Sequence, residues 1–472
     1  MPIGRASLAG VANGAVGAVS ENGRRQSMIR LLYALLMTLV QPLLWLKLHQ
    51  RGRREPGYLK AIGERFGRYP PADQPASAAS VDWVWLHAVS LGETRAAAVL
   101  LDELRQQAPQ LRLLLTHGTA TGRAEGRALL REGDIQVWQP WDAPGPVNRF
   151  LDHFQPRVGV LIETEVWPSL TAACQKRDVP LLMVNARLSE KSLFKAQRVA
   201  WLARPAYRAL SAVYAQTYAD AQRLRQLEAN VQGVFGNVKF DAQPSPGLLL
   251  QGQQWRAAWN AKQARSKRSK RSKPIILFAS SREGEEALLL ACLSALPMAQ
   301  RQAVQWLIVP RHPQRFDDVA ALVQAQGFSV SRRSDWGSNG PVDLIGDATD
   351  AAPVVWLGDS LGEMPLYYAL SEVALLGCSF LPFGGQNLIE AAACGCPVVM
   401  GPHTFNFADA AANSASAGAA FAVADIPAAV TQAVDLLSEE KQLTLARLAA
   451  STFVMQHRGA AQKTAAVVAR LV

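Results

Sequence analysis

From about residue 80 onwards, short apolar runs alternate with longer stretches in which apolar residues recur at helical spacing. Such runs are typical of buried strands, and the longer stretches are typical of helices packed on a sheet. The alternation predicts an α/β fold with parallel sheets covered by helices. The predicted strands are 83–86, 111–116, 136–138, 158–162, 181–185, 212–215, 233–235, 275–279, 306–309, 329–331, 354–357, 373–376 and 398–400. The predicted helices include 95–106, 121–131, 167–177, 283–295, 315–326, 363–370 and 387–394.

The alternation is interrupted once, by the segment DAQPSPG (241–247), a helix-like stretch and the basic run KQARSKRSKRSK (262–273). We therefore predict two Rossmann-like, doubly wound domains at 51–241 and 274–472 that face a cleft, with a linker at 242–273. The basic run contains no aromatic residue, which favours a solvated, disordered insertion. Contact with a lipid surface or with nucleic acid is the alternative.

The N-terminal region predicts membrane anchoring. Residues 1–27 are rich in Gly, Ala and Ser, and we expect them to be disordered. Residues 31–46 are mostly apolar, but a helix of that length reaches about 24 Å, short of a hydrocarbon core of roughly 30 Å. We expect one anchor helix at 28–50, spanning or partly inserted; the alternative is an apolar helix packed on the protein itself. The cations that follow would hold that flank on the cytoplasmic side: Lys47, Arg51, Arg53 and Arg54.

Composition narrows the choice of partner. The net charge is +11 over 472 residues, so acidic partners are expected, such as anionic lipid, phosphorylated substrates or nucleic acid. The five cysteines form neither an evenly spaced framework nor a zinc pattern, which indicates a reducing compartment. No GxGxxG follows the first strand and no Walker lysine motif occurs, which disfavours NAD-dependent enzymes and P-loop NTPases.

In the first half, chemistry-bearing residues stand where predicted strands end. WLHAVSLGE (85–93) delivers Glu93 to the start of a helix, where it could be a helix cap or a catalytic carboxylate. The helix dipole there favours the ionised form of Glu93. Glu163 and Glu165 follow one later strand, Asn185 and Arg187 follow the next, and Lys239 and Asp241 precede the linker. A purely structural account does not explain this gathering.

The second half repeats the pattern with residues suited to a phosphate. Arg311 closes one strand, Gly362-Glu363-Met364 starts a helix, and a Gly384-Gly385 turn precedes Asn387 and Glu390. A helix N-terminus loosened by glycine presents backbone N–H groups to an anion, and Glu390 can accept ribose hydroxyls. Each element also has an ordinary structural interpretation as a cap, a turn or a surface acid. Together they indicate a nucleotide or a nucleotide-sugar.

The joint set of motifs resembles one family. HAVSLGE, ETEVWP, NARLS, NVKFD, PRHPQRF, LGEM, GGQNLIEAAA and MGPHTFNF closely resemble the 3-deoxy-D-manno-octulosonic acid (Kdo) transferases of lipopolysaccharide synthesis, over about residues 28–470. The resemblance implies a GT-B glycosyltransferase at the inner membrane. CMP-Kdo would be the donor, bound by the C-terminal domain, and lipid IVA, the lipid A precursor, the acceptor, bound by the N-terminal domain.

The resemblance also assigns residues. Glu93 matches the general base, and Glu163 and Lys239 match supporting transition-state residues. Gln386 and Arg282 depart from the family pattern, in which His is common at both positions, and this affects the details of donor binding. The positions that match the CMP-binding loops are Pro310, Arg311, Gly362, Glu363, Met364, Asn387, Leu388, Ile389 and Glu390.

The expected chemistry needs neither a metal nor another cofactor. A base removes a proton from the acceptor hydroxyl, and Arg311, Lys239 and backbone amides neutralise the departing phosphate. One base facing one leaving group implies a single displacement with inversion, although Glu163 as the nucleophile of a retaining reaction stays open. Anionic lipid of the inner membrane is an expected partner and nucleic acid is not. The alternatives are a GT-B transferase that uses a UDP-sugar and a non-enzymatic membrane-surface protein.

Overall fold

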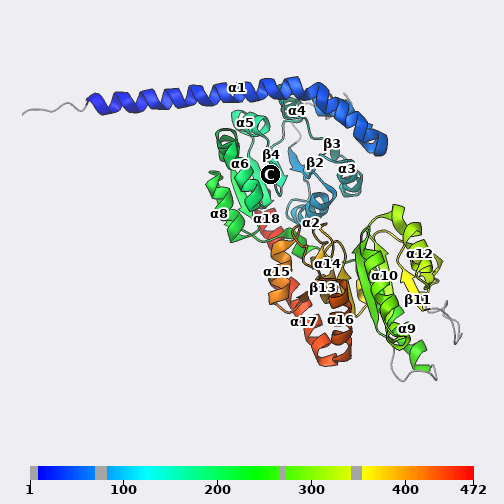
Figure 1. Ribbon diagram of the computed structural model, residues 1–472. Helices are drawn as coiled ribbons and strands as arrows, with labels where there is room; N and C mark the ends of the chain where they lie inside the picture. Colours follow the sequence, from blue (N-terminus) through cyan, green and yellow to red (C-terminus); the bar gives the residue numbers. More distant parts are fainter. Residues whose placement is uncertain (1–8, 70–81, 266–272, 342–352) are drawn as a thin grey trace, which may run out of the picture. The chain divides into compact units, whose positions relative to one another are not determined.

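The computed structural model describes residues 9–69, 82–265, 273–341 and 353–472. The chain forms two compact units, one of Met1–Asp241 with Arg458–Val472 and the other of Ala242–His457. Each unit contains one seven-stranded sheet in which all neighbouring strands are parallel (Figure 1). The two doubly wound domains of the prediction are therefore present.

The sheet of the first unit has the strand order β3-β2-β1-β4-β5-β6-β7. The chain moves outward from β1 in one direction and, after β4, in the other, so the order reverses between these two central strands. Loops that leave neighbouring strands in opposite directions open a crevice at the carboxyl ends, where ligands bind in such sheets. The strands are β1 (Trp83–His87), β2 (Arg112–His117), β3 (Ile135–Trp138), β4 (Val158–Ile162), β5 (Leu181–Ala186), β6 (Ala212–Ala215) and β7 (Val231–Val234).

Side chains of β1 alternate between two apolar layers. Trp83 and Trp85 pack with helices α4, α5, α7 and α8, whereas Val84 and Leu86 pack with α2 and α18. Both faces are covered, so the strand is continuously apolar, as parallel sheets require. The helices of this unit are α2 (Leu91–Gln107), α3 (Ala120–Gly126), α4 (Pro144–Phe154), α5 (Pro168–Lys176), α6 (Glu190–Arg198), α7 (Ala200–Arg208), α8 (Tyr218–Gln226) and α18 (Ala460–Ala469), with the 3-10 helices η1 (Pro56–Leu59), η2 (Ile62–Phe66), η4 (Arg127–Leu129) and η5 (Val238–Asp241).

The sheet of the second unit has the order β10-β11-β9-β8-β12-β13-β14, and its reversal lies between β8 and β12. Its edge strand β14 was not predicted, because its sequence Ala-Phe-Ala lacks the run of β-branched residues that is typical of a strand. The strands are β8 (Ile275–Ser281), β9 (Gln305–Pro310), β10 (Ser329–Arg332), β11 (Val354–Leu357), β12 (Val373–Leu376), β13 (Val398–Met400) and β14 (Ala420–Ala422). The helices are α9 (Pro246–Arg265), α10 (Glu285–Ala295), α11 (Met298–Ala303), α12 (Phe316–Ala325), α13 (Met364–Leu370), α14 (Leu388–Ala393), α15 (Ala408–Ser416), α16 (Ile426–Ser438) and α17 (Glu440–His457), with η6 (Pro313–Arg315) and η7 (Arg333–Asp335).

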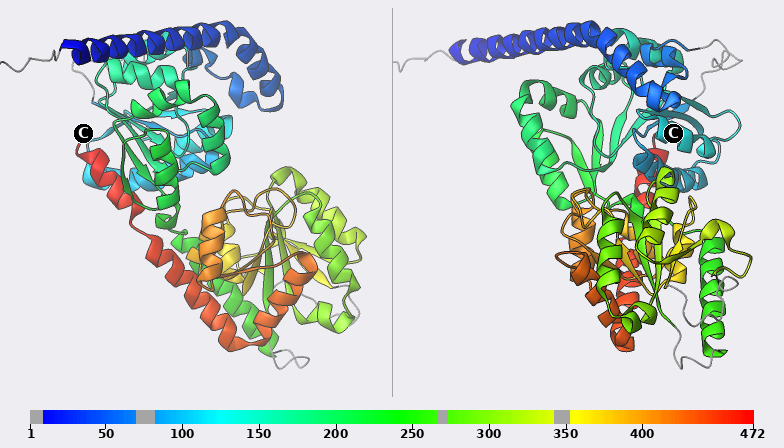
Figure 2. Two further views of the ribbon diagram at one scale, coloured as in Figure 1. Left: turned by 60° about the vertical axis from the view of Figure 1, so that its left-hand side comes forward. Right: turned by 45° about the vertical axis from the view of Figure 1, so that its right-hand side comes forward.

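Helix α1 (Ala9–Arg54) belongs to the first unit and runs along it (Figures 1 and 2). It starts well before residue 28, so residues 9–27, which we expected to be disordered, are helical, and residues 1–8 lie outside the described part. Among the described residues, one helix, Leu31–Arg54, is long and apolar enough to cross a membrane. The predicted anchor helix is thus present as an element.

Two domain boundaries differ from the sequence analysis. The expected linker 242–273 largely forms helix α9, which packs on α13 and so joins the second unit. Residues 458–472, expected in the C-terminal domain, return to the first unit as α18. The reason is local: Asp241 accepts the N–H groups of Gly459 and Ala461 at 2.5 and 2.8 Å, and Ala460, Ala461, Ala465 and Val468 are buried against α2.

Replacing Asp241 by Ala should destabilise the first unit, because it removes the carboxylate that holds the start of α18. Loss of a helix cap costs about 1 kcal/mol, which corresponds to a fall of about 2–4 °C in the unfolding midpoint of a unit of this size. Thermal unfolding of purified protein measures it. Asp425→Ala is the matched control, because Asp425 accepts Ala428 N–H as the cap of α16 in the second unit. Equal midpoints for Asp241→Ala and the unmodified chain would contradict the capping role.

Candidate active site

Glu93 lies in the first turn of α2, directly after the central strand β1. Ser90 is the N-cap, and its hydroxyl accepts the N–H of Glu93 at 3.4 Å. The Glu93 carboxylate turns back and accepts the N–H of Val89 at 2.5 Å. Ser90 therefore caps the helix, and Glu93 is held at the carboxyl end of β1 with 9% of its surface exposed.

The expectation that Glu93 stays fully ionised is wrong near neutral pH. Burial, joined by the charges of Glu163 and Glu165, raises the pKa of Glu93 to about 7, and the N–H groups of Val89 and Ser90 only partly oppose this. Desolvation disfavours the charged carboxylate more than the helix N-terminus favours it. A carboxyl group with this pKa accepts and releases a proton near neutral pH, as a general base must.

Glu163 enters from the neighbouring central strand. It follows β4 with φ 69°, a left-handed backbone conformation that turns the chain sharply at the end of the strand. Its carboxylate accepts a hydrogen bond from Lys239 Nζ at 2.8 Å, and both side chains are mostly buried. Burial also raises the pKa of Glu165, two residues on. The structure thus brings Glu93, Glu163 and Lys239 together, as the sequence analysis expected.

Lys239 reaches this site although it follows the edge strand β7. The 3-10 helix η5 that carries it folds back and packs on α2. Asn185, at the end of β5 with φ 50°, fixes this path: its side-chain oxygen accepts Val238 N–H at 3.1 Å. Gln216 donates to the backbone oxygen of Asn185 at 3.0 Å. Asn185 is therefore a structural support of the site.

Two buried histidines beneath this site were not singled out from the sequence. His87 Nδ1 lies 2.8 Å from Thr116 Oγ1, and His117 Nδ1 lies 2.9 Å from the backbone oxygen of Ala88. Burial lowers the pKa of His87 to about 3 and that of His117 to about 4, so both are neutral. They add no charge near Glu93. Lone histidines in apolar strands are usually core residues, and that interpretation holds here.

In the second unit, Pro310 ends β9 and Arg311 follows it, with its N–H bonded to Ser281 O at 2.9 Å. Burial and the neighbouring charges of Arg282 and Arg311 lower the pKa of His312. Arg282 and Arg311 therefore both lie near His312 at the carboxyl ends of β8 and β9, and Arg282 also pairs with Glu283 at 3.2 Å. This concentration of positive charge suits a phosphate.

The Gly362-Glu363-Met364 turn starts α13, but the Glu363 side chain is already occupied. Arg333 binds its carboxylate through two hydrogen bonds of 3.0 Å, and Ser360 donates a third at 2.5 Å. Gly362 has φ 79°, and its surroundings are open, since no atom lies within 4 Å of a Cβ built there. A ligand at this turn would therefore contact the backbone rather than the Glu363 carboxylate.

Asn387 is the N-cap residue of α14 and makes no capping bond. Its side-chain oxygen is buried and has no hydrogen-bond partner among the described residues. Leu388 and Ile389 point into the core, so only their backbone can meet a ligand.

Gly384 has φ 96°, and a Cβ there would lie 2.3 Å from the Asn406 side chain. Glu390 lies near the buried Tyr368. Burial and the charge of Glu390 raise the pKa of Tyr368 well above its usual value, and the charge of Arg311 opposes this shift.

Glu285 organises these loops, and the sequence analysis missed it. It is fully buried, and its carboxylate accepts the backbone N–H groups of Arg282, Cys378 and Phe380 at 2.9, 2.8 and 3.1 Å. It thereby ties the loop after β8 to the loop after β12, the two strands that flank the reversal. Glu286, also fully buried, binds Arg315 through two hydrogen bonds. In the sequence, the feature that could have revealed these two residues is a pair of adjacent acids at the start of a strongly apolar helix.

The fold is shared with sugar-nucleotide enzymes of the GT-B class. The Anabaena protein HepE in complex with UDP superimposes with a TM-score of 0.52 and 13% identity, covering 83% of this chain and all of that chain. A glycosyltransferase from Rickettsia africae gives a TM-score of 0.51 and 11% identity, covering 82% and 98%. At these identities the likeness concerns the fold alone, and it defines two Rossmann-like domains of the GT-B type.

Sequence comparison defines the family within that class. The family model described as 3-deoxy-D-manno-octulosonic-acid transferase matches residues 60–242. The Kdo transferase of Bordetella pertussis is 43% identical, covering 92% of this chain and 97% of that protein. The Kdo transferase of Haemophilus influenzae is 30% identical over the same shares. The chain belongs to the 3-deoxy-D-manno-octulosonic acid transferase family, and it is a glycosyltransferase.

The raised pKa of Glu93 predicts a stability difference that depends on pH. Between the ordinary value near 4.5 and the folded value of about 7, the unfolded chain is ionised while folded Glu93 still holds its proton. Glu93 thus lowers stability progressively as pH rises through this window, and the loss is complete above it. Glu93→Gln, which stays neutral, should gain up to about 3 kcal/mol over the parent at pH 8 and only about 1 kcal/mol at pH 5.

Urea unfolding from pH 5 to pH 8 measures this gain, with Asp102→Asn, an exposed carboxyl on the same helix, as the matched control. A constant difference between parent and Glu93→Gln across this range would rule out a titration of Glu93 in the window.

Proposed function

We propose that the enzyme transfers Kdo from CMP-Kdo to a hydroxyl of lipid IVA with inversion, and that Glu93 is the general base. The observation that carries the proposal is the position of Glu93: buried, poised near neutral pH, and beside Glu163 at the reversal of strand order. That is where an open parallel sheet places its ligands.

The reaction is a single displacement. The acceptor oxygen attacks the anomeric carbon of Kdo, and its proton passes to the Glu93 carboxylate as the new C–O bond forms. The bond between that carbon and the phosphate oxygen breaks, and CMP leaves with the electron pair. Arg311 and backbone N–H groups at the loops after β8, β9 and β12 would neutralise the phosphate, so the chemistry is electrostatic stabilisation plus one proton transfer.

Glu163 fits a supporting role better than that of a nucleophile. A retaining mechanism needs a free carboxylate that forms a bond to the sugar. The Glu163 carboxylate is instead bound to Lys239 at 2.8 Å, which stabilises its negative charge and lowers its nucleophilicity. In return, Glu163 raises the pKa of Glu93 and so strengthens Glu93 as a base. This arrangement favours inversion.

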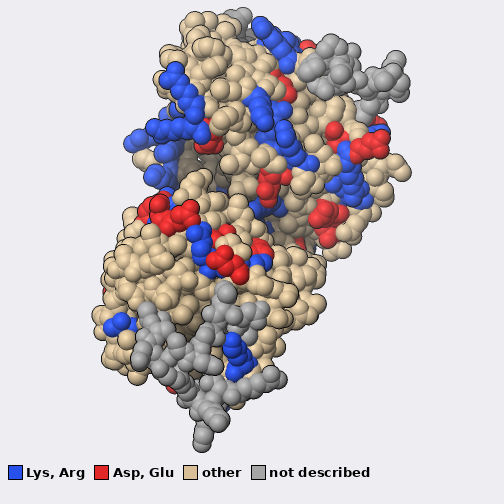
Figure 3. All heavy atoms as spheres, turned by 90° about the vertical axis from the view of Figure 1, so that its right-hand side faces the viewer, with Lys and Arg blue, Asp and Glu red and all other residues tan. Residues whose placement is uncertain are grey.

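The N-terminal helix and the charge of the first unit support a lipidic, phosphorylated acceptor. Leu35, Leu39 and Leu43 of α1 are more than half exposed. On the face shown in Figure 3, lysine and arginine side chains stand out over the first unit, among scattered acidic ones. Each cation near an anionic surface contributes about 1 kcal/mol. We therefore place the enzyme at the cytoplasmic side of the inner membrane, anchored by α1.

Incubation with CMP-Kdo and lipid IVA tests the reaction, with product mass and anomeric configuration as readouts. Glu93→Gln should still bind CMP, while its kcat falls by about 10²- to 10⁴-fold, the usual contribution of a general base. Asp102→Asn, at an exposed acid on the same helix, is the control. Turnover of Glu93→Gln close to that of the parent would remove Glu93 from this role, and a retained configuration would refute inversion.

The identity of the nucleotide is a separate prediction. Solved structures with this fold include complexes with UDP, so a UDP-sugar is the specific competitor. CMP should inhibit transfer competitively with CMP-Kdo, and UDP should not inhibit at the same concentration. Equal inhibition by UDP would favour a UDP-sugar donor and refute CMP-Kdo.

A further inference from the structure

Helix α1 is connected to the first unit by a hydrogen bond that the reaction as described does not use. Tyr33 Oη donates to Asp142 Oδ2 at 2.8 Å. Asp142 follows β3 by a few residues and is 2% exposed. A hydrogen bond to a buried carboxylate contributes more than an ordinary one, because loss of a partner leaves charge desolvated without compensation.

The same carboxylate holds the start of helix α5. Asp142 Oδ2 accepts Ser169 N–H at 3.0 Å, and Oδ1 accepts Leu170 N–H at 2.8 Å. The N-cap residue Trp167 makes no side-chain capping bond of its own. Asp142 therefore supplies the cap of α5 from a distant segment of the chain. The hydroxyl of Ser169 strengthens this contact, because it donates to the backbone oxygen of Asp142 at 3.0 Å.

The start of α5 is also the end of the loop that carries the catalytic acids. Only the residues 163–167 separate β4 from α5, and Glu163 and Glu165 are among them. The strand fixes one end of this loop and Asp142 fixes the other. A shift of α5 would change the distance of both carboxylates from Glu93, and hence its pKa and its geometry toward an acceptor.

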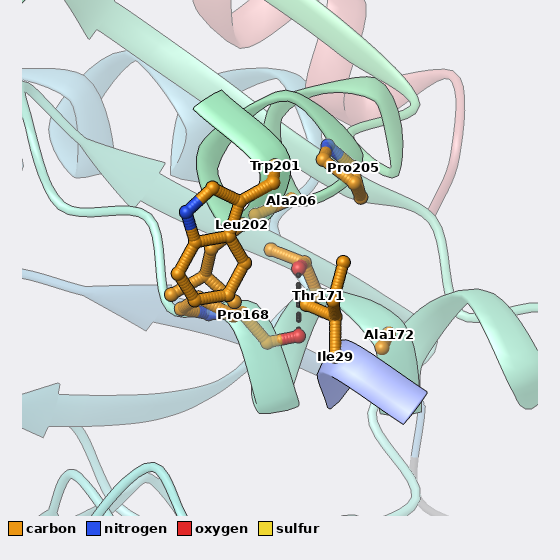
Figure 4. Close-up of a pocket in the computed structure, with 8 residues that line it drawn as sticks. All are labelled: Ile29, Pro168, Thr171, Ala172, Trp201, Leu202, Pro205 and Ala206. Atoms are coloured by element: carbon orange, nitrogen blue, oxygen red, sulfur yellow. Dashed lines mark hydrogen bonds between the residues drawn. The ribbon is translucent and has the colours of Figure 1, made fainter. Parts of the chain in front are cut away.

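A second contact of α1 lies one turn from Tyr33. Ile29 meets Pro168, Thr171 and Ala172 of α5 and residues of α7 around one pocket (Figure 4). Residues 29 and 33 share a face of α1, since they are four apart. The rest of the helix surface carries leucines that stay more than half exposed: Leu31, Leu35, Leu39 and Leu46. One face of α1 thus contacts α5, and the other is available to lipid.

We propose that Tyr33 and Asp142 are positioning residues that couple helix α1 to the Glu163–Glu165 loop. With α1 docked, Tyr33 completes the hydrogen bonds of Asp142, Asp142 holds α5, and the loop sets the carboxylates beside Glu93. The anchor helix then does more than retain the enzyme at the membrane: its docking sets the catalytic geometry. The kinetic consequence rests on the proposed function, whereas the structural link does not.

The kinetic test uses the full chain in vesicles that contain an anionic phospholipid. Tyr33→Phe should lower kcat about tenfold and leave the donor KM within twofold, because small misplacements at a reacting centre cost rate rather than donor binding. Asp142→Asn should lower kcat further. Tyr218→Phe, on the highly exposed Tyr218 of α8, is the matched control and should keep the kcat of the parent. Unchanged kcat in Tyr33→Phe would overturn the proposal.

A second variant distinguishes the effect of α1 on the Glu163–Glu165 loop from its role in attaching the enzyme to the membrane. Leu39→Asn with Leu43→Asn changes only the exposed face, so vesicle binding in sedimentation should fall while kcat on an acceptor dispersed in detergent is kept. Tyr33→Phe should show the reverse, with normal sedimentation and low kcat in both media. If Tyr33→Phe lost activity only together with vesicle binding, Tyr33 would serve anchoring alone and the proposal would fail.

Amide hydrogen exchange tests the link without the reaction. In Tyr33→Phe, exchange in peptides covering 163–176 should become about tenfold faster, whereas peptides of α8 should be unaffected. Unchanged exchange would overturn the link. If the parent itself transferred no Kdo, the proposed function would fail, and this exchange measurement would still decide whether Tyr33 and Asp142 hold the loop.

Discussion

Burial of the Glu93 carboxyl beside other carboxylates is the constraint on which the first unit's site depends. Desolvation and the charges of Glu163 and Glu165 favour the protonated form, and the N–H of Val89 favours the ionised form. The balance places the pKa of Glu93 at about 7, so its carboxyl group can exchange a proton near neutral pH. Lys239 contributes by geometry, because its Nζ binds the Glu163 carboxylate at 2.8 Å and so fixes the position of that side chain.

The sheet provides the means to keep these acids together. Strands β1 and β4 are direct neighbours, and their following segments leave in opposite directions, so Glu93 and Glu163 share one crevice. Positioning then requires support from distant parts of the chain. Asn185 brings in the segment of Lys239, and Asp142 holds the far end of the Glu163 loop. In each support a buried side-chain oxygen accepts backbone N–H groups of the segment that it holds, which gives that segment a defined geometry.

Much of this could be predicted from the sequence. Strands that are buried on both faces are continuously apolar, and so β4, β6, β11, β12 and β13 were predicted with their exact bounds. Glu93, Glu163 and Lys239, which the structure brings together, were singled out because charge at the end of an apolar run is conspicuous.

The features that the sequence analysis did not predict depend on contacts between segments that are far apart in the chain. The return of α18 requires Asp241 to meet Gly459, and the role of Asp142 requires α1 and α5 to converge on it. The pKa of Glu93 also could not be predicted, because a local helix dipole is visible in a sequence and burial is not.

Both units bend the chain in the same way where their sites form. Non-glycine residues adopt left-handed backbone at or just after strand ends: Glu163 and Asn185 in the first unit, Ser280 and Cys378 in the second. Such a conformation costs of order 1 kcal/mol or more and persists only where the surroundings impose it. Here the surroundings are identified: Glu285 holds Cys378 N–H, and the backbone of Glu163 bonds Val184 and Arg187. At Glu163, Ser280 and Cys378 the strained residue lies at or just after a strand that flanks the reversal of strand order, where the chain must turn away from the sheet.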